Sequence, residues 1–434
     1  MSNEFFTYLI LLVILLSIIG SVSFGALIKY HFDGGQKYRS LRNIALFVAN
    51  IPMTINKMIQ SKSINPNKPP ILTKHKNKKR FERFIQNKRD SLLVLPRYDH
   101  SLNMPIVDVI DLINFKTIHT YQYNLSQIVD KNSIKLEYYH PLILDDGSLI
   151  SEGTYTPLFK VDFYSNLKWV NNEIVFHHSK TLDHENNILI PGRLKPHSKL
   201  VNLYQHPIKN FRDDAIIKIN SDGKILYKKS VIEILIENKI GDMINKLKKT
   251  VSDPIHLNCI EPALSDTEHW KKGDVFLSLK HHSAIVLYRP STNKVIDYIT
   301  GPFAHQHDVD IVSKNEISIF NNNNFFIDNK YSEVLIYNFK TKKFKKIFND
   351  ELKKENFKTY SSGMSQILND GALMVEEENH GRIILFNKMG EKEWEFVNKD
   401  KDGNIGEISW SRIIEDKSFI EKFKLLVDRK KSFN

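Results

Sequence analysis

An internal repeat constrains the fold of this chain more than any other feature of its sequence. Each unit holds an apolar run, a turn of Gly, Asp or Asn, a second apolar run, and two later runs such as AIVLY and KVIDYI. The clearest copies cover residues 138–170, 177–230, 256–299, 307–347 and 364–397, and a weaker copy covers residues 91–123. Four strands per unit at a period of about 40 to 55 residues are typical of propeller blades. The repeat therefore predicts an all-β fold, a six-bladed β-propeller.

The domain boundaries follow from where the repeat begins and ends. We place the propeller at residues 91–410 and a helical tail at residues 411–434. The excess over an even period lies mainly between Arg193 and Pro254, where the segment VIEILIENKIGDMINKLKK has helical spacing. This segment predicts a small helical insertion that covers one face of the disc.

An uncharged apolar run near the N-terminus predicts a membrane anchor over residues 1–30. The run from Phe5 to Ile28 carries no charged side chain and is long enough to cross a hydrocarbon core of about 30 Å. It exceeds the apolar core of about 7 to 15 residues found in a signal peptide, which favours an uncleaved transmembrane helix. Residues 31–90 are expected to hold an amphipathic interfacial helix, at Tyr38 to Ser61, and a basic linker.

Composition excludes several classes of protein. A single cysteine, Cys259, leaves no internal disulfide and no thiolate metal cluster. The formal net charge of +12, from 62 Lys and Arg against 50 Asp and Glu, would suit a nucleic-acid partner. No recognition motif accompanies that charge, and the chain is rich in Lys, Asn and Ile throughout. We therefore expect no nucleic-acid partner.

Histidines recur at one position of the repeat. His140, His178 and His307 each stand four residues before an apolar residue of the first run and ten before one of the second, and His256 fits the first half of this register. In a propeller this position, just before the innermost strand, surrounds the mouth of the central channel. We predict that the four imidazoles converge in one funnel. The residues expected beside them are His177, His281, His282, His305 and the cation Lys280.

Two chemistries use such a cluster of histidines. A metal site needs three or four ligands with carboxylates behind them, and Asp308 and Asp310 are near. Acid, base or nucleophilic work on an anionic substrate instead combines imidazoles with a fixed cation, which Lys280 would provide. A propeller that only binds a ligand or partner remains an alternative from another class.

Several ordered motifs point to a known family. They are the His-His pair at 177–178, HLN at 256–258, SLKHHSAI at 278–285, GPFAHQHDVDI at 301–311, and Gln366, Asn369, Gly371 and GRI in the last repeat. Over residues 138 to 410 the chain resembles the bacterial aryl sulfotransferases of the arylsulfate type, which use no nucleotide donor. The resemblance implies a six-bladed propeller with its site in the funnel. It also implies ping-pong transfer of a sulfuryl group from a phenolic sulfate ester to a phenol through a sulfohistidine.

The resemblance assigns roles to individual residues. It places the sulfohistidine at His307, with His256 and His178 in proton transfer and oxyanion stabilisation and Lys280 as the cation. Lys280 stands where the family usually has Arg, which keeps the charge but loses the bidentate fork. Ser179 stands where the family often has Asp, so an orienting partner of His178 is expected to be missing. The residues expected to bind substrate are His140, His177, Asn258, His282 and His305.

The expected partners are small aryl sulfates and phenols, together with a membrane through the N-terminal helix. We expect no metal and no cofactor, and a homo-oligomer is compatible with the sequence. Lys29, Lys37, Arg39 and Arg42 follow the apolar run and favour a cytoplasmic body. The resemblance implies work outside the cytoplasm, and we follow it to a single-pass inner-membrane protein with a periplasmic propeller. The alternatives are a noncatalytic binding propeller and a metal-dependent hydrolase or lyase.

Overall fold

The computed structural model contains two compact units, Met1–Pro66 and Asn67–Asn434. The residues that the structure describes are 3–32, 48, 69–86, 88–128, 137–153, 156–204, 210–240, 252–324 and 331–433. The predicted amphipathic helix at 38–61 lies, apart from residue 48, outside the described residues.

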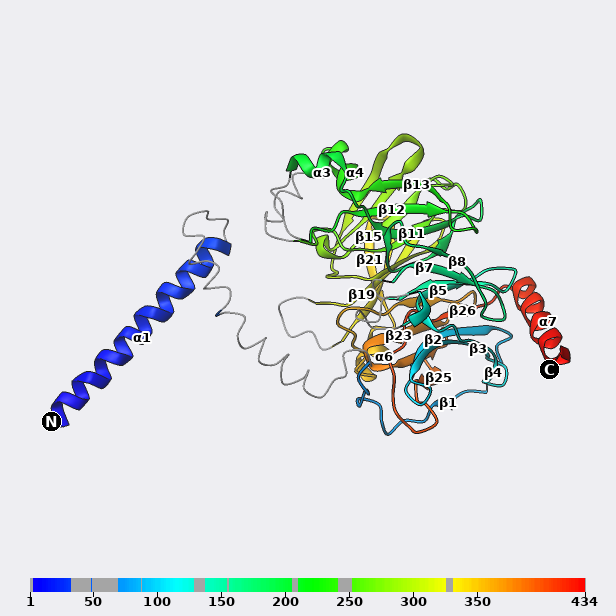
Figure 1. Cartoon of the computed structure of the whole chain (residues 1–434), viewed down its shortest axis with the longest axis horizontal. Helices are drawn as coiled ribbons and strands as arrows, with labels where there is room; N and C mark the ends of the chain where they lie inside the picture. Colours follow the sequence, from blue (N-terminus) through cyan, green and yellow to red (C-terminus); the bar gives the residue numbers. More distant parts are fainter. Residues whose placement is uncertain are drawn as a thin grey trace. The chain divides into compact units, whose positions relative to one another are not determined.

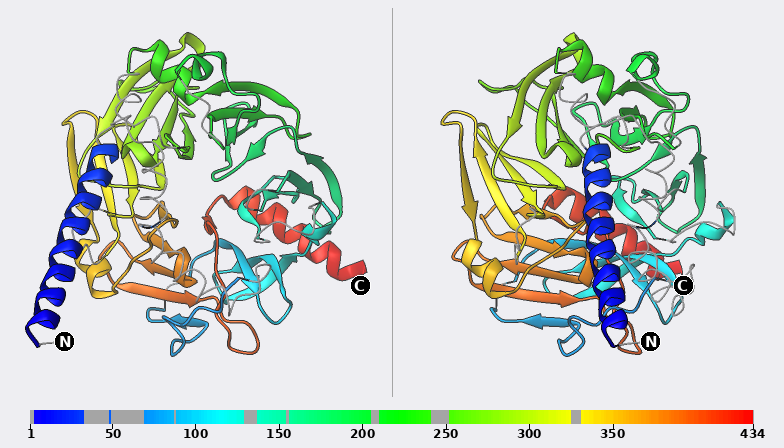
Figure 2. Two further views of the ribbon diagram at one scale, coloured as in Figure 1. Left: turned by 60° about the vertical axis from the view of Figure 1, so that its left-hand side comes forward. Right: turned by 90° about the vertical axis from the view of Figure 1, so that its left-hand side faces the viewer.

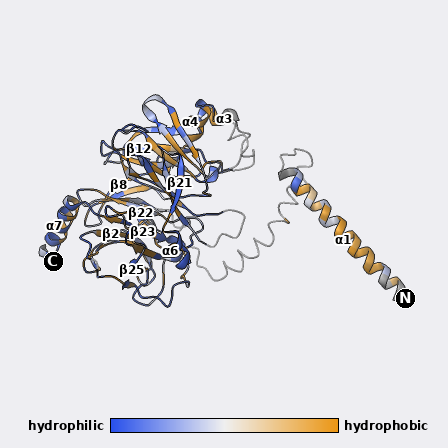
Figure 3. Cartoon of the chain, turned by 180° about the vertical axis from the view of Figure 1, so that it is seen from behind, coloured by the Kyte–Doolittle hydropathy of each residue, from blue (hydrophilic) through white to orange (hydrophobic). Residues whose placement is uncertain are grey.

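The first unit holds one long helix, α1 (Asn3–Phe32) (Figure 1). Its segment Tyr8–Tyr30 is 23 residues long and apolar enough to cross a membrane. At a rise of 1.5 Å per residue this segment is about 35 Å long. Figure 3 shows apolar residues along most of α1. The helix is a candidate membrane span, although a signal sequence near the N-terminus meets the same criteria of length and composition.

The second unit is a six-bladed β-propeller of antiparallel sheets, which Figure 2 shows arranged in a ring. The first blade has the order β26 (Arg412–Ile414), β2 (Leu92–Asp99), β3 (Met104–Asp111), β4 (Lys116–Tyr121). The second has β5 (Tyr139–Ile143), β6 (Leu149–Glu152), β7 (Leu158–Val161), β8 (Leu167–Asn171). The third has β10 (Thr181–Leu182), β11 (Ile188–Arg193), β12 (Asp214–Ile219), β13 (Ile225–Ser230), with β9 (Val175–Phe176) also on β11.

The other three blades follow the same antiparallel order. The fourth has β14 (Leu257–Pro262), β15 (Val275–Leu279), β16 (Ala284–Arg289), β17 (Lys294–Thr300). The fifth has β18 (Asp308–Ser313), β19 (Glu316–Asn321), β20 (Glu333–Asn338), β21 (Lys343–Ile347). The sixth has β22 (Ser365–Ile367), β23 (Leu373–Glu377), β24 (Arg382–Phe386), β25 (Lys392–Val397), β1 (Phe81–Arg83). The six sheets coincide with the six predicted repeats, so the predicted fold class is confirmed.

The ring is closed by pairing the two ends of the repeat region. β26 pairs with β2, with Leu92 opposite Ile414 and Val94 opposite Arg412. β1 adds an outer strand to β25. Both strands lie outside residues 91–410. Closure of this kind leaves the first blade with an innermost strand from the far end of the chain.

The core lies between neighbouring blades, where apolar faces of adjacent sheets meet. One such cluster joins β2 and β3 to β6 and β7 and includes Leu92, Leu149 and Phe159, all fully buried. Helix α7 (Lys417–Phe433) packs on this cluster through the spaced residues Ile420, Phe423 and Val427. Removing such apolar surface from water contributes about 25 cal/mol per Å². The cores between blades therefore hold the ring rigid around its axis.

Short helices lie between the strands of the propeller. They are α3 (Lys199–Tyr204), α4 (Val231–Glu237), α6 (Asn349–Lys354), η1 (Leu125–Gln127), η2 (Lys280–His282), η3 (Pro290–Thr292) and η4 (Glu378–His380). α4 begins the segment predicted to be helical, with Ser230 as its N-cap accepting from the Glu233 N–H. Residues 241–251 of that stretch lie outside the described residues.

Candidate functional site

The histidines of the repeat come together where the innermost strands begin. His178 lies at the centre, with ring centroids 5.6 Å from His140, 5.3 Å from His256 and 6.2 Å from His307. The His177 ring is 5.0 Å from that of His178. Four consecutive blades thus bring their imidazoles to one place, as the register predicts.

An unusual backbone conformation accompanies this convergence. His140, His178 and His256 have positive φ angles of 43°, 63° and 53°. In the fifth blade the left-handed residue is His305 (φ 55°), and His307 is not among the residues with positive φ. The register therefore predicts where His307 lies but not its backbone conformation. Such strained conformations persist only where the surroundings fix them, and they cluster at functional sites.

A cavity of about 210 Å³ opens beside the cluster. It is lined by Tyr139, Glu152, Gly153, Val175, Phe176, His177, His178, Arg193, Arg212, His256, Lys280, Ser361 and Ser362. The lining includes apolar and aromatic side chains, three cationic side chains, and the carboxylate of Glu152, which pairs with Lys180. The cavity can therefore hold an aromatic molecule with an anionic group.

Only some of the predicted site residues line this cavity. His177, His178, His256 and Lys280 do. The others are absent from its lining: His140, Asn258, His282, His305 and His307. His307 is 1% exposed. The Nε2 of His307 is therefore buried and does not face this cavity directly.

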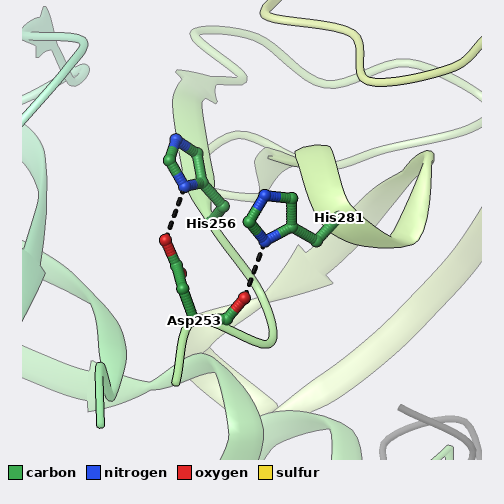
Figure 4. Close-up of side chains that lie close together, drawn as sticks. All are labelled: Asp253, His256 and His281. Atoms are coloured by element: carbon green, nitrogen blue, oxygen red, sulfur yellow. Dashed lines mark hydrogen bonds and ion pairs between the residues drawn. The ribbon is translucent and has the colours of Figure 1, made fainter. Parts of the chain in front are cut away.

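A carboxylate and a guanidinium orient His256. The Nδ1 of His256 lies 2.7 Å from Oδ2 of Asp253, and Nη1 of Arg212 lies 2.7 Å from the same oxygen (Figure 4 shows the imidazole and carboxylate). Burial lowers the pKa of His256 to about 4, although the hydrogen bond to Asp253 opposes this effect. Burial alone would raise the pKa of Asp253, but the bond from His256 and nearby charges lower it well below its usual range. The ionised carboxylate accepts the Nδ1 proton, so the lone pair of His256 is on Nε2.

Asp253, His256 and His281 also form a group with potential metal-ligand atoms within 4.8 Å of one another. Of the four histidines that the repeat register brings together, only His256 belongs to this set. The Nδ1 of His281 lies 2.6 Å from the backbone oxygen of Asp253 (Figure 4). Both Nδ1 atoms therefore act as donors in this arrangement, and a metal would have to displace these protons or use the Nε2 atoms.

A chain of two contacts orients His178. Its Nδ1 lies 2.7 Å from Nδ1 of His177, whose Nε2 lies 3.3 Å from Oδ1 of the fully buried Asp214. Burial would raise the pKa of Asp214, but the neighbouring His177 lowers it below its usual value. In the tautomer that places a proton of His177 on Nε2, toward this carboxylate, His178 donates its Nδ1–H to His177 and has its lone pair on Nε2.

This arrangement corrects one expectation from the sequence. Ser179 does not leave His178 without an orienting partner, because His177 and Asp214 take that role. The Oγ of Ser179 instead accepts a hydrogen bond from the N–H of Ile260 at 3.0 Å. The orienting carboxylate comes from β12 and not from the residue after the histidine pair.

His307 has a neutral partner. Its Nδ1 lies 2.6 Å from Oδ1 of Asn322, and its buried Nε2 has no hydrogen-bond partner among the described residues. Burial and the charge of Lys280 hold the pKa of His307 well below its ordinary value, against the hydrogen bond to Asn322. The imidazole is therefore neutral at physiological pH.

Lys280 is the predicted cation, and it faces these histidines. Burial lowers its pKa from the ordinary value. Its charge lowers the pKa values of His256, His305 and His307. Among the described carboxylates, none lies within the 4 Å ion-pair distance of its Nζ. Arg193 and Arg212 add two guanidinium groups to the cavity, so bidentate forks are present although Lys280 lacks one.

Three of the remaining predicted residues make contacts outside the cavity lining. Asn258 donates from Nδ2 to the backbone oxygen of Gln306 at 3.0 Å, next to His307. The Nδ1 of His282 lies 3.1 Å from the Tyr298 hydroxyl. The His140 ring stacks on Trp410 with centroids 3.9 Å apart.

Sequence reasoning missed the residues that orient the imidazoles. Arg212 and Asp253 lie in the stretch assigned to the helical insertion, and Asn322 lies in the asparagine run 321–324. Asp214 begins a strand. A signal existed only for Asp253, which stands three residues before His256.

Comparisons with known proteins identify the family of this chain. Residues 147–399, more than half of the chain, match the family model of the arylsulfotransferases (ASST). No curated protein sequence matches the chain. A solved structure of a protein of unknown function from Bacteroides caccae aligns at 10% identity over 75% of this chain and 100% of that chain, with a TM-score of 0.48. Virginiamycin B lyase from Staphylococcus aureus aligns at 12% identity over 59% of this chain and 69% of that chain, with a TM-score of 0.34. Hydrazine synthase from Kuenenia stuttgartiensis aligns at 9% identity over 65% of this chain and 70% of that chain, with a TM-score of 0.39. Likenesses this distant carry no argument about activity. The family match over residues 147–399 shows that the chain belongs to the arylsulfotransferase family.

Proposed function

We propose that this protein transfers a sulfuryl group from a phenolic sulfate ester to a phenol, through a sulfohistidine at His307 and without a nucleotide donor. The observation that carries the proposal is the convergence of the imidazoles of His178, His256 and His307, each with a partner at Nδ1, next to a cavity lined by three cationic side chains. Membership of the arylsulfotransferase family supports the class of reaction.

In the first half-reaction, the rings around the buried His307 move apart to admit the donor, and Nε2 of His307 attacks the sulfur. The N–S bond forms, the S–O bond breaks, and the leaving phenolate takes a proton from His256. The anionic sulfate and Asp253 both favour protonated His256, so binding of the donor raises its pKa from about 4. His256 is thus the general acid of this step.

In the second half-reaction, an acceptor phenol gives its proton to His256 and attacks the sulfur of the sulfohistidine. The new O–S bond forms, the N–S bond breaks, and His307 is free again. The proton returns to His256, so both half-reactions balance. Burial and the surrounding imidazoles hold the pKa of His178 well below its ordinary value, so His178 stays neutral and accepts hydrogen bonds.

The cavity supplies recognition of both parts of the donor. Tyr139, Val175 and Phe176 offer an apolar wall for the aromatic ring. Lys280 and Arg212 place positive charge where the sulfuryl oxygens gain negative charge. The same cationic surface disfavours a neutral ester, because its charge would then be left without a partner.

We propose that α1 anchors the protein in the inner membrane, with the propeller in the periplasm. The 23-residue apolar segment of α1 supports a span. A reporter that is active only in the periplasm, fused to the C-terminus, tests the orientation. Activity of a cytoplasmic reporter at the same position would reverse the assignment.

A single-turnover assay tests the proposed reaction. The full chain in detergent micelles receives a ³⁵S-labelled aryl sulfate without acceptor, and phenol release and protein-bound label are measured. We expect about one equivalent of each from the wild type and neither from His307→Ala. His184→Ala is the matched control, since His184 lies at a different cavity, and it should behave like the wild type. Turnover without label, or label on another histidine, would contradict the role of His307.

The group Asp253, His256 and His281 favours a second candidate, a metal-dependent hydrolase or lyase. Metal analysis of the purified full chain separates the two. Stoichiometric zinc or iron that disappears in Asp253→Asn would support the metal enzyme and overturn the acid–base role of His256.

A further inference from the structure

Both ends of the Asn322 side chain are committed to hydrogen bonds. Its Nδ2 lies 3.0 Å from the backbone oxygen of Thr359 and 2.9 Å from that of Ser362. Its Oδ1 lies 2.6 Å from Nδ1 of His307. The residue is fully buried and directly follows β19.

These contacts fix the direction of the amide. Backbone carbonyl oxygens only accept hydrogen bonds, so the NH₂ group of Asn322 must face Thr359 and Ser362. The amide oxygen therefore faces His307, and since that oxygen only accepts, Nδ1 of His307 must carry the proton. The lone pair of the neutral imidazole is then on Nε2.

The backbone around Asn322 is held as firmly as its side chain. Lys358 donates from Nζ to the Asn322 carbonyl at 2.8 Å, and the Ser332 hydroxyl lies 3.4 Å from the same oxygen. The Ser332 hydroxyl also lies 3.2 Å from the oxygen of Thr359. Rotating the amide would break its hydrogen bonds to the carbonyl oxygens of Thr359 and Ser362 and would set the amide oxygen against these two acceptors.

We propose that Asn322 is a positioning residue for the nucleophile, which sets the proton of His307 on Nδ1 and keeps the imidazole uncharged. This inference rests on the proposed function, because it assumes that His307 attacks through Nε2. A carboxylate at this place would stabilise the imidazolium and remove the lone pair. Asp253 gives His256 such a carboxylate, so the two histidines have partners suited to different tasks.

The other groups around His307 act in the same direction as the neutral amide. The groups that face it from the neighbouring elements are Lys280, His256, His178 and His140. None of these is an anion, so none stabilises a charged His307. After sulfuryl transfer the Nδ1–H still donates to Asn322, which steadies the sulfohistidine until the acceptor arrives.

Nitrogen spectra of the histidines test the inference without requiring activity. The full chain, labelled with ¹⁵N-histidine and placed in lipid nanodiscs, is measured by magic-angle-spinning NMR, and His307→Gln identifies the His307 signals. We expect a neutral ring protonated on Nδ1 in the wild type at pH 7. A ring protonated on Nε2 or on both nitrogens would overturn the inference, whether or not the protein transfers sulfuryl groups.

A charge substitution supplies the second test. In Asn322→Asp we expect the pKa of His307 to rise by about 1 to 3 units. When the burst of phenol release is measured against pH, the low-pH side of its profile should move upward by the same number of pH units. Asn379→Asp is the matched control, because Asn379 anchors the same loop at Thr359 and Tyr360 and has no contact with His307. An unchanged burst profile in a folded Asn322→Asp chain would overturn the inference. Absence of a burst in the wild type would instead refute the proposed function alone.

Discussion

Replacing Asp253 by Asn tests whether His256 protonates the leaving phenolate. The substitution keeps the shape of the side chain and removes the charge 2.7 Å from the imidazole. Because an opposite charge at this distance raises a histidine pKa by about 1 to 3 units, the protonated fraction of His256 should fall by about 10- to 1000-fold. Arg212, which now pairs with Asp253, would face the imidazole without a carboxylate and lower its pKa further.

The assay compares donor esters whose phenols differ in acidity. Simple phenols, with a pKa of about 10, need a proton to leave, so kcat/KM for their esters should fall by about 10- to 1000-fold in Asp253→Asn. Nitrophenol leaves as the anion, so its ester should lose little. Asp297→Asn in the same blade, which breaks only an exposed ion pair with Lys342, should leave both rates unchanged.

A uniform loss across all donors would refute this reasoning, because it would assign Asp253 a structural role or a role in binding. No loss for the simple phenols would remove His256 as the acid. A plot of log kcat/KM against the pKa of the phenol separates these results, since only loss of the acid steepens its slope.

Three further changes test other parts of the site and the fold. Lys280→Met should lower kcat by about 100- to 1000-fold, whereas Lys280→Arg should retain activity because it keeps the positive charge. Steady-state kinetics with one aryl sulfate measures both variants. Equal losses of kcat in the two variants would refute a role for the charge. Asp214→Asn should lower kcat by up to about 100-fold with KM unchanged, because His178 loses its fixed orientation; a rise in KM alone would contradict this. The melting temperature should fall as the pH drops from 6.5 to 4. Burial lowers the pKa of His119 to about 3 and the pKa values of His256 and His282 to about 4 in the folded chain. In this pH range the unfolded chain therefore binds more protons than the folded chain, which destabilises the fold. His119→Phe should flatten this dependence, and an unchanged slope would show that His119 does not contribute.

The fold was predictable from the sequence because the same local pattern of apolar runs and turns recurs in six segments of the chain. The turn after β5, with Gly147 at a φ of 75°, and the turn after β22, with Gly371 at 84°, are typical of these short connections. β26 was not predictable in this way. It is three residues long, and it pairs with β2 more than 300 residues earlier in the chain, so neither periodicity nor local propensity reveals it.

The same distinction applies to the site. The convergence of His140, His178, His256 and His307 follows from the register, since equivalent positions of a ring face one axis. The partners of the rings do not follow, because they come from loops and neighbouring strands that the repeat leaves free to vary. The side chain of Asn322, for example, has a meaning only once Thr359 and Ser362 of the next blade are beside it.

These free positions explain how a symmetric ring can carry an asymmetric reaction. Identical imidazoles would compete for one proton and share one pKa, and no atom would be reserved for attack. An amide beside His307, a carboxylate beside His256, and an imidazole backed by a carboxylate beside His178 break that equivalence. In the proposed reaction, the amide leaves a neutral nucleophile and the carboxylate favours a ring that gains and loses a proton, whereas burial among other imidazoles holds His178 neutral. Because each partner lies outside the repeat register, exchanging partners between rings should exchange their proton affinities while the six blades remain unchanged.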